Sequence, residues 1–151
     1  MSHEENKAIV RRFIEAYNTR NLDVFDDVVA PDYVDHTHHQ QGLESFRQLF
    51  QLAFRAFPDW HEHIEDIIAE GDKVWVCVRA TGTHTGEWNI SGVPLPPTGR
   101  KVTLMMVFIW RIARGKLVEG WEVDNELDFL RQLGVIEYTE QGKKLFPEDT
   151  G

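Results

Sequence analysis

Hydrophobic residues in the first third of the chain recur at the spacing of helices. Residues 4–19 carry apolar side chains three and four positions apart: Ile9, Val10, Phe13, Ile14 and Tyr17. This spacing places them on one face of a helix. A shorter pattern predicts a second helix over 22–29, with Asn21 as its N-cap and Pro31 at its end. A third helix is predicted over 46–57, stopped by Pro58, with a brief strand before it at 32–35.

After Pro58 the period changes from that of a helix to that of a strand. The pattern predicts two strands within 61–84 joined by a turn at 70–72, and a further strand pair, 101–112 and 116–125, joined at 113–116. A loop rich in Gly and Pro, 86–99, separates the two pairs. Residues 126–133 return to a helical pattern, and residues 138–151 are expected to form a loose tail.

Helices grouped before an antiparallel sheet indicate an α+β fold. Long strands twist strongly, so the sheet should curl around the N-terminal helices as a cone-shaped barrel with an internal cavity. The 151 residues suit a single domain, 1–151.

Charge and composition narrow the classes of partner. The formal net charge of −9 argues against nucleic acid and anionic membrane surfaces, because both are bound through Lys and Arg. No stretch approaches eighteen apolar residues, and the first residues lack the apolar core of a signal peptide. A cytoplasmic location is the expectation. The single cysteine, Cys77, has no partner for an internal disulfide.

An acid pair stands in the last predicted strand. On a regular strand Glu122 and Asp124 share one face with Gly120, whereas Trp121 and Val123 take the other and would pack under a helix. The acids either face water or line a cavity. In the second case an apolar wall of Met106, Phe108 and Trp75 would raise a carboxylate pKa, and the neighbouring acid would raise it further. Such a base could remove a proton next to a carbonyl.

The segment 35–39, DHTHH, offers a second group of candidates. In an extended segment His36 and His38 share a face and could hold a metal ion. However, no HExxH motif is present and a third ligand cannot be named, so no metal is predicted. A polar loop is the preferred interpretation of His38 and His39.

Three apolar features bear on ligands and partners. Trp88 lies in the loop, where it could cover a ligand, and Tyr17 could send its hydroxyl into the cavity or remain a core residue. The continuous apolar run 104–110 is typical of a strand covered on both faces. It therefore predicts a homodimer through the outer face of the sheet.

Four segments together resemble the SnoaL-like polyketide (ester) cyclases, within the wider fold group of nuclear transport factor two and ketosteroid isomerase. In chain order they are IVRRFIEAYNTRNLDVFDDVVAPDYVDH, GTHTGEW with GVPLPPTGRKV, RIARGKLVEGWEV, and LDFLRQLGV. They span most of residues 9–135. The PPTGR loop and the closing QLG are moderately specific as a pair.

The resemblance implies intramolecular aldol chemistry on a small apolar or aromatic molecule, without a metal or organic cofactor. It implies that Glu122 is the general base, where the family usually has Asp. It also implies that Asp35, in place of an Asn, and His36 lie near the cavity mouth as a proton shuttle or substrate donor. Met106 and Phe108 replace a polar Gln and His pair, and the loop 86–99 is slightly longer than usual.

Three functions stay open at this point. The chain is either a cofactor-free enzyme of the cyclase or isomerase type acting on a small carbonyl compound, or a non-catalytic binding or interaction module of the same fold. The third possibility is a structural dimer whose cavity is filled by its own side chains.

Overall fold

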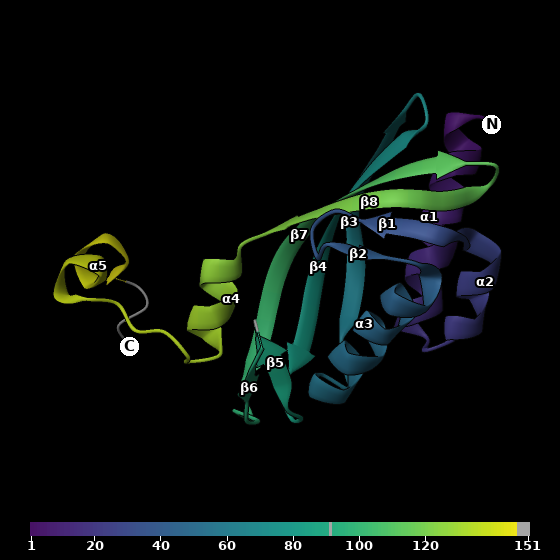
Figure 1. Ribbon diagram of the computed structural model, residues 1–151. Coiled ribbons are helices and arrows are strands. Elements are labelled where there is room, and N and C mark those ends of the chain that lie inside the picture. Colours follow the sequence, from purple (N-terminus) through teal and green to yellow (C-terminus); the bar gives the residue numbers. More distant parts are fainter. Residues whose placement is uncertain (91, 148–151) are drawn as a thin grey trace.

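A curved sheet wraps around a group of helices in the computed structural model of the chain, which describes residues 1–90 and 92–147 (Figure 1). The helices are α1 (His3–Asn18), the 3-10 helix η1 (Leu22–Val24), α2 (Phe25–Val28), α3 (Leu43–Ala56), α4 (Glu126–Gln132) and α5 (Glu140–Leu145). The strands are β1 (Val29–Asp35), β2 (Gln40–Gln41), β3 (His61–Glu70), β4 (Lys73–Thr83), β5 (Trp88–Ile90), β6 (Val93–Leu95), β7 (Lys101–Ala113) and β8 (Lys116–Asp124).

Within the described residues the main sheet has six strands in the order β2-β1-β8-β7-β4-β3. The strands β3, β4, β7 and β8 pair antiparallel, as predicted. The first strand does not: β1 runs parallel to β8, so the sheet is mixed. The α+β class is confirmed, and the sheet stays open between its edges β2 and β3 rather than closing into a barrel. This order places β1, from the start of the chain, directly beside β8, from its end.

The helices cover the concave face of the sheet through an aromatic core. Ser2 caps α1 by accepting a hydrogen bond from the Glu5 backbone, and α1 then buries Phe13 against Phe46 of α3 and Trp110 of β7. The large apolar side chains explain why these long helices pack here, since burying each stabilises the fold by about 1.5–3 kcal/mol.

The second predicted helix is shorter than expected. It is a 3-10 turn followed by the single turn of α2, and Asn21 makes no side-chain cap. Strand β1 already begins at Val29, so Pro31 lies within β1 and does not end the helix. The β-branched Val28 and Val29 favour this early change to strand.

Strands β7 and β8 provide part of the lining of the cavity described below. On β7 the buried residues alternate: Leu104, Met106, Phe108 and Trp110. Opposite them, Gly120 faces Trp110, Glu122 faces Phe108 and Asp124 faces Met106. A bulge after Arg111 shifts the register, so that Leu117 is buried on the same side as Gly120.

The convex face of the sheet is largely apolar across its middle, and no helix of the described residues covers it. Cross-strand pairing aligns two rows across it: Ile68, Trp75, Ile109 and Trp121, then Cys77, Val107 and Val123. Val123 is 60% exposed, so the prediction that it and Trp121 pack under a helix is wrong. Trp75 is 48% exposed on this face, which contradicts its predicted place in the cavity wall.

Two segments predicted to be irregular contain regular structure. The loop 86–99 forms the hairpin β5–β6, and residues 140–145 form α5, capped by Thr139. Figure 1 shows α5 well away from the sheet, at the end of an extended segment. The last four residues of the predicted tail, 148–151, lie outside the described part of the chain. Among the described residues, no helix is both long and apolar enough to cross a membrane.

Candidate functional site

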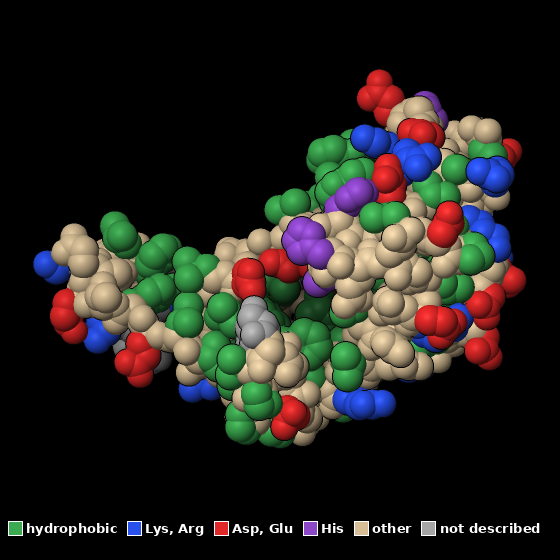
Figure 2. All heavy atoms as spheres, viewed as in Figure 1, with side chains coloured by type: hydrophobic (Ala, Val, Ile, Leu, Met, Phe, Trp, Pro, Cys, Tyr) green, Lys and Arg blue, Asp and Glu red, His purple; other side chains and the backbone are tan. Residues whose placement is uncertain are grey.

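A cavity of about 190 Å³ opens between α3 and the concave face of the sheet. Its walls are largely aromatic: Phe46, Phe50 and Phe54 come from α3, and Phe108 and Trp110 from β7. Figure 2 shows the hollow with hydrophobic side chains inside it and histidine and acidic side chains at its rim. The volume is many times what one water molecule requires, so the interior is not filled by the protein's own side chains.

Glu122 and Asp124 line this cavity, together with Met106 and Phe108. The Glu122 side chain is 21% exposed. Its burial raises the pKa of Glu122 to about 8; the positive charge of His38 opposes this rise, and Asp124 and Asp35 add to it. A carboxyl group with a pKa near neutrality can both accept and return a proton at physiological pH.

Asp35 ends β1 and folds the next residues into a tight turn. Its Oδ1 accepts hydrogen bonds from the backbone N–H groups of Thr37 and His38, each 3.1 Å long. Its Oδ2 lies 2.8 Å from His38 Nδ1. The Asp35 carboxylate thus brings the imidazole of His38 back over the cavity, which Asp35 and His38 both line.

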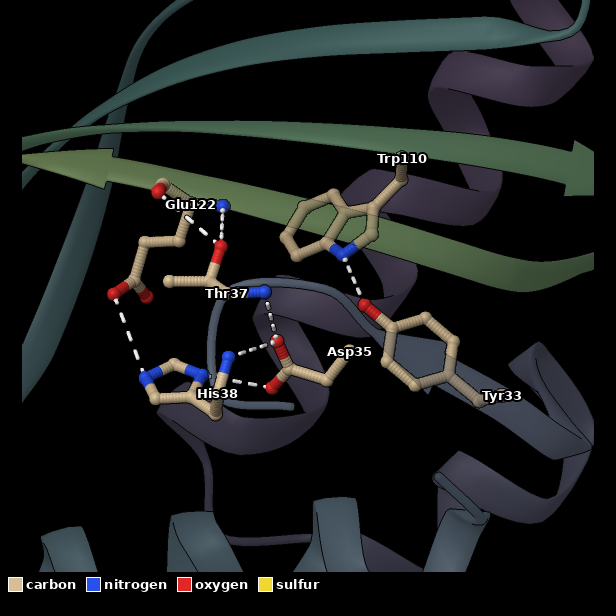
Figure 3. Close-up of polar contacts among 6 residues, drawn as sticks. All are labelled: Tyr33, Asp35, Thr37, His38, Trp110 and Glu122. Carbon is tan, nitrogen blue, oxygen red and sulfur yellow. Dashed lines mark hydrogen bonds and ion pairs between the residues drawn. The ribbon is translucent and has the colours of Figure 1, made fainter. Parts of the chain in front are cut away.

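Thr37 fastens this turn to the backbone of the acid strand. Its hydroxyl accepts a hydrogen bond of 2.7 Å from the Glu122 N–H and donates one of 3.3 Å to the Glu122 C=O. Figure 3 shows the result: His38 lies between Asp35 and the Glu122 side chain. His38 Nε2 is 3.9 Å from Glu122 Oε2.

The acidic groups around His38 affect its pKa. The hydrogen bond to Asp35 raises the pKa of His38, as do the negative charges of Asp35, Glu122 and Asp124, while burial lowers it. His38 and Glu122 also act on each other, since the positive charge of His38 lowers the pKa of Glu122 and the negative charge of Glu122 raises that of His38. Asp35, His38 and Glu122 therefore form a row of interacting charges at the cavity rim, with a hydrogen bond between Asp35 and His38 and an ion pair between His38 and Glu122.

His36 does not reach the cavity, contrary to the expectation. Its ring stacks on Trp121 with 4.5 Å between centroids, and its Nε2 lies 3.0 Å from Glu119 Oε2. The expectation assumed an extended segment, whereas the turn after Asp35 sends His36 and His38 to different sides. The described residues also contain no group of three or more His, Cys, Asp and Glu side chains arranged to hold a metal ion.

Tyr33, also on β1, places its hydroxyl beside the acid strand. The Tyr33 Oη accepts a hydrogen bond of 3.0 Å from Trp110 Nε1, and both residues are buried (Figure 3). A Cβ at Gly120 would clash with this hydroxyl and with the Trp110 ring. Gly120 is therefore required for a close approach. Burial raises the pKa of Tyr33, and the nearby Asp35 and Glu122 raise it further, so the hydroxyl stays neutral.

A second buried acid, Glu62 on β3, lines another part of the cavity wall. It forms hydrogen bonds with the Tyr17 hydroxyl and with Trp60 Nε1, the latter 3.2 Å long. Burial raises the pKa of Glu62 well above its ordinary value, and the charge of Glu122 adds to the effect, which favours the protonated acid. Tyr17 is thus a buried partner of Glu62 and not part of the cavity lining. Trp88 does lie in the wall, next to Phe57.

The sequence reading missed four residues of this site, for different reasons. Tyr33 and Trp110 share inward faces with Asp35 and Phe108, so the period of two could have found them. His38 required recognition of the turn that Asp35 closes. Glu62 was hidden because a bulge between Ile64 and Asp66 changes the phase of β3.

Comparisons with known proteins agree with this architecture. The family model of the SnoaL-like polyketide cyclases matches residues 7–133. The chain is 30% identical over 146 residues to aklanonic acid methyl ester cyclase DauD of Streptomyces sp. (strain C5), covering 92% of this chain and 88% of that protein. It is 28% identical over 127 residues to the nogalonic acid methyl ester cyclase of Streptomyces nogalater, covering 80% and 91%.

A solved structure shows the same fold. The crystal structure of AclR from Streptomyces galilaeus, provisionally assigned as a hydroxylase, superimposes with a TM-score of 0.78 at 28% identity. The match covers 97% of this chain and 92% of that chain.

Proposed function

The chain belongs to the SnoaL-like polyketide cyclase family, and from this premise we propose that it closes a ring in a small polyketide ester by an intramolecular aldol reaction. Glu122 is the general base of the proposed reaction. The observation that carries the proposal is the Glu122 carboxyl group, which lines a largely aromatic cavity and has a pKa raised by burial to about 8. Relatives named for polyketide methyl esters support the choice of substrate class.

The proposed reaction is a proton transfer followed by carbon–carbon bond formation. The Glu122 carboxylate removes a proton from the carbon next to a carbonyl group; the C–H electron pair forms a C=C bond and the carbonyl oxygen becomes an enolate. The enolate carbon then attacks a second carbonyl of the same molecule. The resulting alkoxide takes back the proton from Glu122, which restores the carboxylate. No electrons are gained or lost overall, so this step requires no redox cofactor.

His38 and Asp35 have a supporting role in this proposal. The hydrogen bond from His38 Nδ1 to Asp35 favours an imidazolium, whose positive charge stands 3.9 Å from the Glu122 carboxylate. This charge opposes the effect of burial and keeps a useful fraction of Glu122 ionised at neutral pH. Asp124 raises the basicity of Glu122 from the same strand face.

The proposal is tested with aklanonic acid methyl ester and nogalonic acid methyl ester as substrates. We expect ring closure and exchange of the acidic C–H proton with D₂O by the native protein, and loss of both in Glu122→Gln. Glu119→Gln is the matched control, because Glu119 lies on the same strand but bonds with Arg111 on the outer side. If Glu122→Gln exchanges the proton as fast as the native protein does, Glu122 is not the base.

A non-catalytic binding module is the second candidate, and the apolar pair Met106 and Phe108 favours it. Neither side chain can donate a hydrogen bond to an enolate oxygen. A module of this kind would bind the aromatic esters in the cavity but leave their acidic proton unexchanged in the native protein. The same exchange experiment therefore separates the two functions.

The outer sheet face supports a further proposal, a homodimer. Ile68, Trp75 and Val123 expose 59%, 48% and 60% of their surfaces on a face that carries no helix. Apolar surface on several neighbouring strands is costly in water and is typical of an interface. A second copy of the same chain can cover it by two-fold symmetry, with each face buried by the other.

A further inference from the structure

Enolate formation requires a hydrogen-bond donor for the developing negative charge on oxygen. Removing one such donor from an enzyme site lowers turnover by about 10²–10³-fold. The strand opposite Glu122 presents Met106 and Phe108, which are not donors, so the donor must come from another element. The cavity wall offers hydroxyl, indole and imidazole groups, and their existing hydrogen bonds decide which of them is available.

Most of these donors are already engaged. The Trp60 N–H bonds to Glu62, the Trp110 N–H bonds to Tyr33, and His38 lies between Asp35 and Glu122. Glu62 of β3 bonds both to the Tyr17 hydroxyl of α1 and to the Trp60 N–H. Trp88 lies on the hairpin β5–β6, beside Phe57.

The Tyr33 hydroxyl is different. In the described part of the chain it accepts a hydrogen bond from Trp110 and makes no other, so its own proton is left to donate. Tyr33 lines the cavity, and its raised pKa keeps that proton in place at neutral pH. A hydroxyl that accepts one bond donates another more strongly, because the two bonds polarise each other.

The position of the hydroxyl relative to Glu122 suits an enolate. It touches the place that a side chain at Gly120 would occupy, and Gly120 and Glu122 lie on the same face of β8. Residues two apart on a strand are separated by about 6.6 Å. A carbonyl oxygen and the proton on its neighbouring carbon fit between two groups at such a spacing, one bound by each.

We infer that the Tyr33 hydroxyl is a catalytic hydrogen-bond donor that binds the substrate's carbonyl oxygen and stabilises the enolate, with Trp110 as its positioning residue. The inference rests on the proposed function and names its second catalytic group. As Glu122 takes the proton, the C–H pair moves into the C=C bond and the carbonyl pair moves to the oxygen, which accepts the Tyr33 hydrogen bond. Tyr33 keeps its proton throughout.

The inference also fixes where the reacting carbonyl would lie in the cavity. The reacting carbonyl must reach past the rim, where His38 and Glu122 lie, to the space beside Gly120 and the Tyr33 hydroxyl. The aromatic side chains of α3 then contact the flat part of the molecule.

The test measures oxygen recognition separately from turnover. The probe is 2-naphthol, a planar aromatic hydroxyl compound, and naphthalene is the control ligand without oxygen. We expect Tyr33→Phe to weaken naphthol binding by about 10-fold and to leave naphthalene binding unchanged. Tyr138→Phe, which removes a hydroxyl from the tail where Tyr138 stacks on Phe146, should change neither.

Two further variants guard against a trivial loss of structure. Tyr33→Phe leaves the buried Trp110 N–H without an acceptor, whereas the double variant Tyr33→Phe/Trp110→Phe removes both partners. The double variant should show the same loss of naphthol affinity as the single one. Trp110→Phe alone should lose less, since the hydroxyl remains but is no longer held.

Turnover of aklanonic acid methyl ester supplies the second measurement. We expect Tyr33→Phe to lower kcat by about 100-fold with a smaller change in KM. Equal naphthol affinity in Tyr33→Phe and the native protein would overturn the inference, as would unchanged kcat. If Glu122→Gln stays active, the proposed function fails, and the naphthol comparison still decides whether Tyr33 binds oxygen. If only Glu122→Gln is inactive, the base stands and the donor is wrong.

Discussion

Replacing Glu122 by Gln should make the protein more stable at alkaline pH, because burial of this carboxyl group opposes its ionisation. The folded-state pKa of about 8 lies above the ordinary value of 4.5. The folded state therefore binds the proton more tightly than the unfolded state. The stabilisation that this bound proton gives to the folded state is fully present below about pH 4.5 and is lost as the pH rises to about 8. Gln carries no such proton, so its variant lacks this loss.

The magnitude follows from the difference of about 3.5 between the two pKa values. Each pKa unit corresponds to about 1.36 kcal/mol. The protonation of Glu122 can therefore change the free energy of unfolding by at most about 5 kcal/mol. Because 21% of the Glu122 side chain is exposed, water relaxes around the charge and reduces this value. We expect a relative gain of roughly 2–3 kcal/mol for Glu122→Gln between about pH 5 and about pH 8.

The assay is urea unfolding of both proteins at these two pH values. The control is Glu87→Gln, which replaces an exposed glutamate directly before β5. The two unfolding free energies of native protein and Glu122→Gln should diverge as the pH rises, whereas the control should run parallel to the native protein. Parallel curves for Glu122→Gln would show that Glu122 is already ionised in the folded state, and the tuned base would be refuted.

Three further outcomes follow from the described contacts. The activity of the native protein should rise with pH toward about 8 as Glu122 ionises. His38→Ala should move this rise to higher pH, because the positive charge that lowers the Glu122 pKa is gone. Both are measured as pH–rate profiles, and an unmoved profile for His38→Ala would contradict the role of His38. Gly120→Ala should cost about 1–3 kcal/mol of stability, measured by urea unfolding, because its Cβ clashes with the Tyr33–Trp110 pair; a neutral effect would mean that this pair is not tightly held. Val123→Glu should convert a dimer to a monomer in light scattering, since it places a charge on the outer apolar face, and a monomeric native protein would exclude the interface.

The helices, strands and acid face were predictable because they depend on local periodicity. Phe13 and Phe46 lie on apolar helical faces, and Glu122 alternates with Trp121 along β8, so a period of 3.6 or 2 describes them. The parallel pairing of β1 with β8 was not predictable in this way, since no local pattern states which strands meet.

The errors arose where the chain departs from regular geometry. Trp75 was assigned to the cavity because aromatic residues on strands are usually buried, but its register places it opposite Ile109 on the outer face. His36 was expected at the cavity, but His38 lies there instead. The prediction assumed an extended segment, whereas Asp35 closes a turn after β1. One carboxylate with two backbone hydrogen bonds thus decided which imidazole faces the cavity.

The two hydrogen bonds between Thr37 and the backbone of Glu122 join positions 85 residues apart in the chain. Contacts of such long range form late, because the ends of a long segment must first be brought together. During synthesis and refolding, the helices and the hairpin β3–β4 can therefore form before the turn after Asp35 is joined to β8. A chain cut short before β8 would lack the strand that joins β1 to β7, and with it the backbone to which Thr37 bonds.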